Sequence, residues 1–156
     1  MAEHVVFDGG TEADRRRLLE VHRAYLAAND RFDVEGLRRV WSADPTNVFF
    51  NLNGHTYVGL EEQWAPLWRY YGTRLRTTEP WRSSDLKVLV RGDMAVISCH
   101  RTCRLDWVGE GPPPAGFANR PVRSRSTEVL AREGGDWKVV HVHFSVASDD
   151  PRPGGL

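Results

Sequence analysis

Cysteine is scarce in this chain, and its scarcity excludes several classes of protein. Only Cys99 and Cys103 occur among 156 residues. Two thiols cannot build the disulfide framework of a small secreted domain, and no CxxC pair suggests a zinc knuckle or a redox motif. Residues 1–10 lack the pattern of a secretory signal, and no apolar run approaches the roughly 18 residues that span a bilayer. We therefore expect a reduced, cytoplasmic protein without a membrane partner.

An excess of charge of one sign is also lacking. Lys and Arg together number 21, Asp and Glu together number 21, and the formal net charge is zero. General nucleic-acid binders need a cationic excess, so we expect no nucleic-acid partner. The chain has no Gly-rich phosphate loop and no GxSxG nucleophile elbow. We therefore expect no nucleotide or other cofactor and find no support for serine hydrolase chemistry.

The length fits one domain. Residues 1–10 are predicted to be an N-terminal extension, residues 11–147 a single domain, and residues 148–156 a flexible tail rich in Pro and Gly. Residues 109–121 contain a Pro triplet and three glycines, which is typical of a long loop. The loop lies between two strand-like segments and does not divide the chain into two domains.

The first half of the chain is predicted to be mostly helical. Thr11 and Asp14 resemble a capping box, and Asp33 is suited to cap a second helix. Pro66 lies inside a third helical stretch, where we expect a kink or an irregular turn. The helical periodicity covers residues 11–29, 33–41 and 59–71.

The second half is predicted to be strands, and a small hairpin precedes it. Asn53-Gly54 is a favoured two-residue hairpin turn, because both residues accept positive φ. The expected strands are residues 48–50, 56–58, 86–90, 94–108, 122–132 and 137–147. Helices followed by antiparallel strands indicate an α+β domain, in which one sheet curls around the helices to bury their apolar faces.

Several segments resemble one known superfamily. They are Tyr25 on its helix and residues 33–37, 41–44, 59–62, 91–96 and 136–145. The pattern is similar to the nuclear transport factor 2-like superfamily, in its SnoaL-like and ketosteroid isomerase-like branch. Residues 136–145 are also similar to the last strand of the calcium/calmodulin-dependent kinase II association domain. The resemblance covers residues 11–147.

The resemblance implies a cone-shaped half-barrel. A curved, largely antiparallel mixed sheet would wrap around three N-terminal helices and enclose one mostly apolar pocket for a small hydrophobic molecule. The outer face of the sheet often forms a dimer in such proteins, so a homodimer or higher homo-oligomer is expected. The superfamily holds both enzymes and non-catalytic binding or assembly domains, so the fold alone does not give the function.

Comparison with ketosteroid isomerase suggests individual roles. Its oxyanion donor matches Tyr25, and its second acid matches Glu128. Its general base would fall near Phe50 or Asn51, neither of which can abstract a carbon-bound proton. A carboxyl group at Glu128 facing the pocket could act as acid, base or hydrogen-bond donor. Strand alternation leaves the direction of Glu128 open, because both faces of its strand carry apolar residues.

Arg101 lies in the middle of a strand, where the kinase association domain has a pocket arginine. A buried guanidinium needs an anion, which could be Glu128, an acidic ligand or a structural salt-bridge partner. The neighbouring His100 is a spare base if its face of the strand turns inward.

His141 and His143 point the same way from the last strand and could hold a metal with a third ligand such as His100. Val140, Val142 and Phe144 form the opposite, apolar face, which is the better candidate for the core. That placement turns the two histidines outward, and we predict no metal site.

The aromatic residues can fill the core or wall a pocket. Buried Trp and Tyr need partners for their polar atoms, and aromatic walls suit a flat or cyclic ligand. The residues expected to contact a substrate are Trp41, Phe50, Trp64, Trp68 and Phe144.

The sequence favours a small-molecule enzyme that acts by proton transfer on an apolar cyclic or aromatic carbonyl compound. Isomerisation, cyclisation and dehydration are the reactions in question. Glu128 would be the acid or base, Tyr25 the oxyanion donor and Arg101 an orienting cation, with His100 in reserve. The alternative is a non-catalytic domain that binds a small ligand or assembles into an oligomer.

Overall fold

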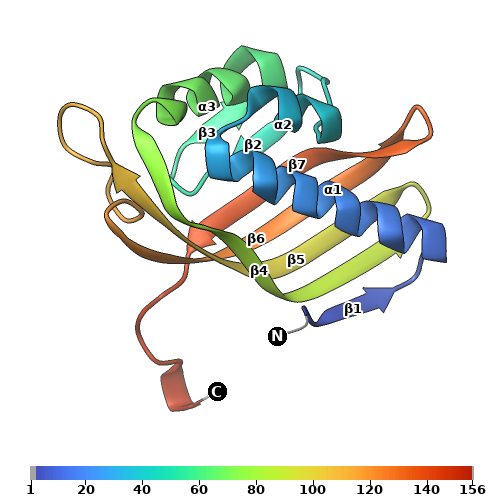
Figure 1. Ribbon diagram of the computed structural model, residues 1–156. Coiled ribbons are helices and arrows are strands. Elements are labelled where there is room, and N and C mark those ends of the chain that lie inside the picture. Colours follow the sequence, from blue (N-terminus) through green and yellow to red (C-terminus); the bar gives the residue numbers. More distant parts are fainter. Residues whose placement is uncertain (1–2, 156) are drawn as a thin grey trace.

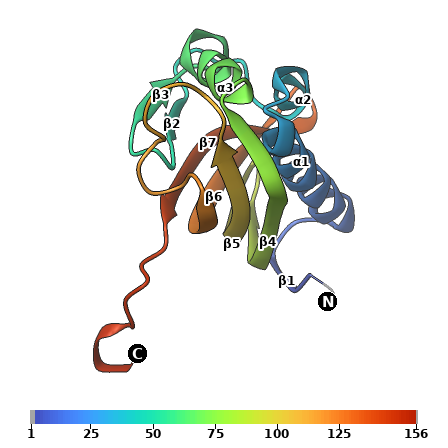
Figure 2. The same ribbon diagram turned by 60° about the vertical axis from the view of Figure 1, so that its left-hand side comes forward.

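The computed structural model describes residues 3–155 and has an α+β architecture (Figures 1 and 2). One seven-stranded sheet has the order β1-β4-β5-β6-β7-β2-β3 and curves around helix α1, which lies across its concave face (Figure 1). Two strand pairs are parallel, β1 with β4 and β2 with β7, and the others are antiparallel. The predicted fold class, a curved mixed sheet wrapped around three helices, is confirmed.

The bounds of the elements follow in chain order. The helices and turns are α1 (Glu12–Arg31), α2 (Val34–Val40), the π-helical turn η1 (Leu60–Trp64), α3 (Ala65–Gly72) and the 3-10 turn η2 (Pro153–Gly155). The strands are β1 (Val5–Asp8), β2 (Val48–Phe50), β3 (Thr56–Val58), β4 (Leu75–Arg91), β5 (Met94–Trp107), β6 (Arg120–Glu133) and β7 (Asp136–Val146). Within residues 3–155, no helix has the length and apolar character needed to cross a membrane.

Local sequence signals explain where the helices begin and end. The Thr11 hydroxyl accepts from the backbone of Asp14, and the Asp14 carboxylate accepts from the backbone of Thr11, so the predicted capping box is confirmed. Asp33 caps α2 by accepting from the backbone of Gly36. The predicted irregular turn near Pro66 is also confirmed, because the π-helical turn η1 passes into α3 one residue before it.

Strand β4 begins at Leu75, well before the predicted start at residue 86. Register shifts interrupt its pairing with β5 between Glu79 and Arg82 and again between Ser84 and Lys87. Such bulges break the alternation of buried and exposed residues, so the first half of the strand lacks the period-two pattern. The N-terminal extension also contains a strand, β1, which pairs with the second half of β4.

Two further details differ from the prediction. Strands β2 and β3 have the predicted bounds, but the turn between them is not centred on Asn53-Gly54. The Gly54 N–H donates to the Asn51 carbonyl, and of the Asn53-Gly54 pair only Gly54 has a positive φ, at 82°. In β7, the buried residues are Trp137, Val139, Val142 and Phe144, whereas Val140 is half-buried. The cause is a bulge that leaves Val140 unpaired between the partners of Val129 and Leu130.

Ion pairs fix the start of α1 to the β6–β7 hairpin. Arg17 donates to both carboxylate oxygens of Asp136, at 2.8 and 2.9 Å. Asp14 accepts from Arg132 at 2.9 Å and from the Trp137 indole at 3.2 Å. The capping residue of the helix is therefore also a tertiary contact with the sheet.

The Arg17–Asp136 pair should make the protein less stable in acid. Its hydrogen bonds lower the pKa of Asp136 from 3.8 to about 2. A folded-state pKa below the unfolded value adds stability that is present above pH 3.8 and is lost as the pH falls through about 2. Asp136→Asn should remove at most about 1 kcal/mol at neutral pH, because the pair is partly exposed. Urea unfolding should then show a shallower loss between about pH 5 and pH 2 than in the wild type.

Asp150→Asn is the control, since the Asp150 carboxylate makes no ion pair among residues 3–155. A pH profile of Asp136→Asn as steep as that of the wild type would contradict this assignment.

Candidate functional site

A small cavity lies between α1, α3 and the concave face of the sheet. Its volume is about 30 Å³, which has room for no more than a few water molecules. A larger ligand must therefore displace side chains. We call it the aromatic cavity, after the wall residues Trp64, Trp68, Tyr71, Trp81, Phe117 and Phe144.

Only some of the residues predicted to contact a substrate line the aromatic cavity. Trp64, Trp68 and Phe144 line the aromatic cavity. Trp41 is buried behind the wall, where its ring stacks on Trp64 at 5.8 Å. Phe50 points the other way and is 40% exposed, because its neighbour Phe49 takes the inward position on β2. The expectation that Phe50 contacts a substrate therefore does not fit its place in the fold.

Arg101 is fully buried behind the wall of the aromatic cavity and does not line it. Its guanidinium lies 4.4 Å from the Trp81 ring centre, 5.0 Å from that of Tyr25 and 5.1 Å from that of Phe144. It donates to the Tyr25 hydroxyl at 3.4 Å and to the Asn29 side-chain oxygen at 3.2 Å. Trp81, Phe144 and Asn29 also line the cavity, so Arg101 lies directly behind its wall.

Within residues 3–155, no carboxylate lies within salt-bridge distance of Arg101, although Glu128 and Asp30 are near enough to interact with its charge. Its Nε atom is buried and makes no hydrogen bond to these residues. Arginine stays protonated in proteins, and burying an unpaired charge is costly. The aromatic rings offset part of this cost, since the face of each ring attracts a cation. The arrangement leaves Arg101 able to bind an anion or a developing negative charge.

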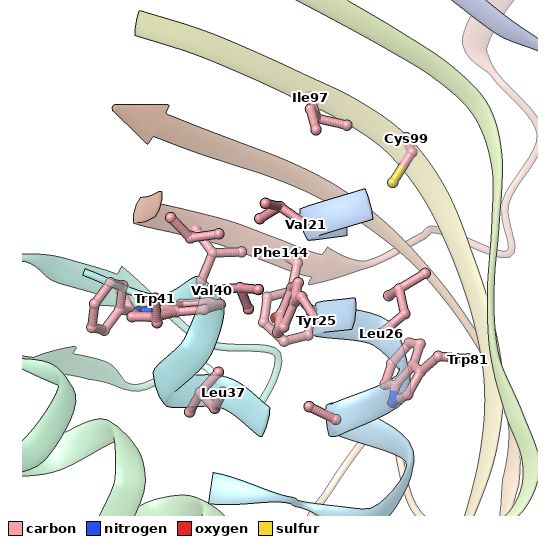
Figure 3. Close-up of a cluster of buried hydrophobic side chains, with 14 of the residues drawn as sticks. Val21, Tyr25, Leu26, Leu37, Val40, Trp41, Trp81, Ile97, Cys99 and Phe144 are labelled. Carbon is pink, nitrogen blue, oxygen red and sulfur yellow. The ribbon is translucent and has the colours of Figure 1, made fainter. Parts of the chain in front are cut away.

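Tyr25 projects from α1 into the core (Figure 3), where it contacts Arg101, and like Arg101 it does not line the aromatic cavity. Burial raises the pKa of its hydroxyl, although the nearby Arg101 acts in the opposite direction. The hydroxyl therefore keeps its proton at neutral pH. Because the oxygen already accepts from Arg101, that proton is free to be donated to a ligand oxygen.

Glu128 points inward from β6 and is fully buried, which settles the direction that strand alternation left open. Its two carboxylate oxygens each lie 2.9 Å from Nδ1 of His22, on α1. Glu128 does not line the aromatic cavity. The next inward residue on β6 is Ser126, whose partner on β7 is the wall residue Phe144. Ser126 Oγ is buried and makes no hydrogen bond within residues 3–155.

The sequence indicated neither the role of His22 nor that of Asn29. Both lie on the face of α1 that carries Tyr25, at spacings of three and four residues. A titratable histidine within an otherwise apolar helical face was the one available signal. Their partners lie 61 to 106 positions away in the chain, so no local pattern could reveal the contacts.

The predicted reserve base, His100, is on the outer face of the sheet. Its ring bonds to Asp85 at 2.9 Å, and both side chains are well exposed. His100 alternates with the inward Arg101 on β5 and therefore cannot reach the cavity. His141 bonds to the backbone oxygen of Val48. Within residues 3–155, no three His, Cys, Asp or Glu side chains are arranged to hold a metal ion.

The two cysteines are also buried on the inner face of β5. Burial is the main cause that raises the pKa of each thiol to about 12. Since the thiolate is the reactive form, Cys99 and Cys103 are not suited to act as nucleophiles at neutral pH.

The family of the chain follows from a comparison with known proteins. A family model described as a SnoaL-like domain matches residues 18–149, and the chain belongs to this family. No curated protein matches the chain.

Solved structures share the fold at low sequence identity. A ketosteroid isomerase-like protein from Erwinia carotovora atroseptica is 15% identical, with a TM-score of 0.70 over 88% of this chain and 99% of that chain. A proposed calcium/calmodulin-dependent kinase II association domain from Exiguobacterium sibiricum is 12% identical, with a TM-score of 0.68 over 91% and 99%. A proposed dehydratase of the NTF2-like family from Streptomyces avermitilis is 18% identical, with a TM-score of 0.67 over 88% and 99%. The resemblance to the nuclear transport factor 2-like superfamily is thus confirmed.

Breaking the His22–Glu128 pair on one side only should be the costly change. His22→Leu leaves the Glu128 carboxylate buried without this partner, and we expect a loss of about 3–5 kcal/mol in the free energy of unfolding. Replacing both residues by Leu removes both polar partners, so the double variant should lose less. Urea unfolding of the single and double variants measures the difference.

His100→Leu is the matched control on the outer face and should change stability by no more than about 0.5 kcal/mol. A double variant less stable than His22→Leu would show that the pair does not behave as a buried unit.

Proposed function

We propose that this protein is a small-molecule enzyme that acts by proton transfer on an apolar cyclic or aromatic carbonyl compound. Isomerisation, cyclisation or dehydration is the reaction class. The observation that carries the proposal is Arg101, a buried cation without a carboxylate partner behind the wall of the aromatic cavity. The names of the ketosteroid isomerase-like and dehydratase relatives support the same class.

In the proposal, Arg101 and Tyr25 stabilise the charge that develops in such a reaction. Removing a proton next to a carbonyl group places negative charge on the carbonyl oxygen. In the proposal, that oxygen lies against Arg101 and accepts from the Tyr25 hydroxyl, while Asn29 holds the guanidinium in place. These groups are fixed before the reaction and are shielded from water, which strengthens their effect. The rings of Trp64 and Trp68 would pack against the apolar body of the substrate.

Glu128 is the proposed acid–base group, held by His22. Because Glu128 does not line the cavity, a substrate must extend past Phe144 toward Ser126 to reach it. The unpartnered Ser126 hydroxyl supports a polar ligand atom at this point. Phe117 comes from the loop between β5 and β6, so movement of that loop would enlarge the cavity without disturbing the sheet.

Exchange of carbon-bound protons tests this proposal without knowledge of the natural substrate. The protein is incubated in D₂O with a panel of cyclic ketones, and NMR follows the loss of signals from protons next to the carbonyl. We expect the wild type to accelerate exchange for at least one ketone, and Glu128→Gln to lower that rate by about 100-fold or more.

Glu110→Gln, which alters an exposed carboxylate in the β5–β6 loop, is the control and should keep the wild-type rate. Full activity of folded Glu128→Gln would show that Glu128 is not the acid–base group. A wild-type protein that accelerates no exchange across the panel would count against the enzyme itself.

Arg101 also favours a second candidate, a non-catalytic domain that binds a small acid. A carboxylate would supply the anion that the buried guanidinium lacks, and the aromatic cavity would hold its apolar part. The relative described as a kinase association domain supports a homo-oligomer, such as a homodimer, in this alternative.

Benzoate and benzamide distinguish an anion site from an apolar pocket, because they have the same shape and differ in charge. Tryptophan fluorescence follows their binding, since Trp64, Trp68 and Trp81 line the cavity. Benzoate should bind about tenfold more tightly than benzamide, and Arg101→Met should abolish this preference. Arg125→Met, on the exposed outer face of β6, should preserve it. Equal affinity of the wild type for the two compounds would rule out Arg101 as an anion site.

A further inference from the structure

A chain of hydrogen bonds connects the buried Glu128 with the surface of the molecule. Glu128 bonds to Nδ1 of His22 at 2.9 Å, and Nε2 of the same ring lies 3.0 Å from Oγ of Ser83 on β4. The Ser83 hydroxyl donates to the carboxylate of Glu3 at 3.0 Å. Glu128 and His22 are fully buried, whereas the Glu3 side chain is 24% exposed.

The donor and acceptor pattern of the chain is complete. Ser83 has one hydroxyl proton and gives it to Glu3, so its oxygen accepts from an N–H at Nε2 of His22. Nδ1 of His22 faces the carboxylate of Glu128, which accepts. In the arrangement that we consider, both ring nitrogens of His22 carry a proton, and every link then joins one donor to one acceptor.

The outer end of the chain is a carboxylate that releases a proton readily to water. Burial alone would raise the pKa of Glu3, but the hydrogen bonds from Arg23 and Ser83 outweigh it and lower that pKa. Arg23 donates to the second carboxylate oxygen of Glu3 at 2.7 Å, so this end of the chain is also fixed in position. A shallow groove lined by Glu3, Arg23, Asp30 and Ser83 opens it to solvent.

We infer that Glu3 and Ser83 form a path that moves protons between solvent and the His22–Glu128 pair. In the outward direction, the Nε2–H bond of His22 breaks as an O–H bond forms at Ser83. The original O–H bond of Ser83 breaks as one forms at Glu3, which then releases the proton to water. His22 is left neutral, Ser83 is unchanged, and the inward direction reverses each step.

The path would give the buried His22–Glu128 pair access to protons from solvent. An acid–base group must exchange protons with solvent, yet both members of this pair are fully buried between α1 and the sheet. Ser83 lets the proton pass while the core stays closed. The use made of this proton rests on the proposed function, whereas the exchange itself does not, and the two can be tested separately.

Two substitutions of similar shape isolate the Ser83 hydroxyl. Ser83→Thr keeps a hydroxyl group, whereas Ser83→Val replaces it by a methyl group of similar size, which also prevents a water from taking its place. Both residues are favoured in strands. NMR of protein labelled with ¹⁵N-histidine measures the rate at which the His22 Nε2 proton exchanges with water. No ligand is needed.

We expect exchange in Ser83→Thr to stay near the wild-type rate and exchange in Ser83→Val to be at least about tenfold slower. The ring N–H of His141, which faces the Val48 carbonyl on the other side of the sheet, is the internal reference and should not change. Glu3→Gln, at the partly exposed end, should also slow the exchange and carries less risk to folding.

Equal His22 exchange rates in the Thr and Val variants would overturn the inference. It would also be overturned if Nε2 carried no proton and Ser83 reacted with a fluorophosphonate probe. Ser83 would then be a nucleophile with His22 as its base. If the path is confirmed and the ketone test fails, the path stands and only the proposed reaction is withdrawn.

Discussion

Helix α1 buries three polar side chains against the concave face of the sheet, and the rest of the site depends on satisfying them. His22, Tyr25 and Asn29 share one face of this helix. A buried polar group without a partner costs about 1–3 kcal/mol, so each needs an opposite group on the strands. Glu128 and Arg101 supply these groups. The position of the two buried charges therefore follows from the packing of a single helix.

Glu128 and Arg101 have different kinds of partner, and this difference separates the site into two parts. Glu128 has a direct partner in His22, whereas Arg101 is held by neutral hydroxyl and amide oxygens and by three aromatic rings. Rings stabilise a cation without neutralising it, so Arg101 keeps its capacity to attract an anion. The inner part of the core thus holds a carboxyl group with a direct imidazole partner, and the part behind the cavity wall holds a cation without a carboxylate in direct contact.

Local signals in the sequence predicted the local parts of this structure. The capping box of Thr11, the cap at Asp33 and the irregular turn near Pro66 each depend on a few neighbouring residues. The partner of His22 and the outward direction of Phe50 depend on which strands lie side by side. Periodicity gives two faces for each strand but does not show which face is buried, and one bulge is enough to exchange them.

In strand β4, the bulge that the sequence pattern did not reveal also positions two residues of the site. Trp81 and Ser83 face inward at odd positions, whereas Leu86 and Val88 face inward at even positions. The bulge at Asp85, which has a φ of 54°, shifts the alternation between them. A regular strand would direct either the first pair or the second pair outward. The bulge lets one strand complete the core with its second half and supply Trp81 and Ser83 to the site with its first.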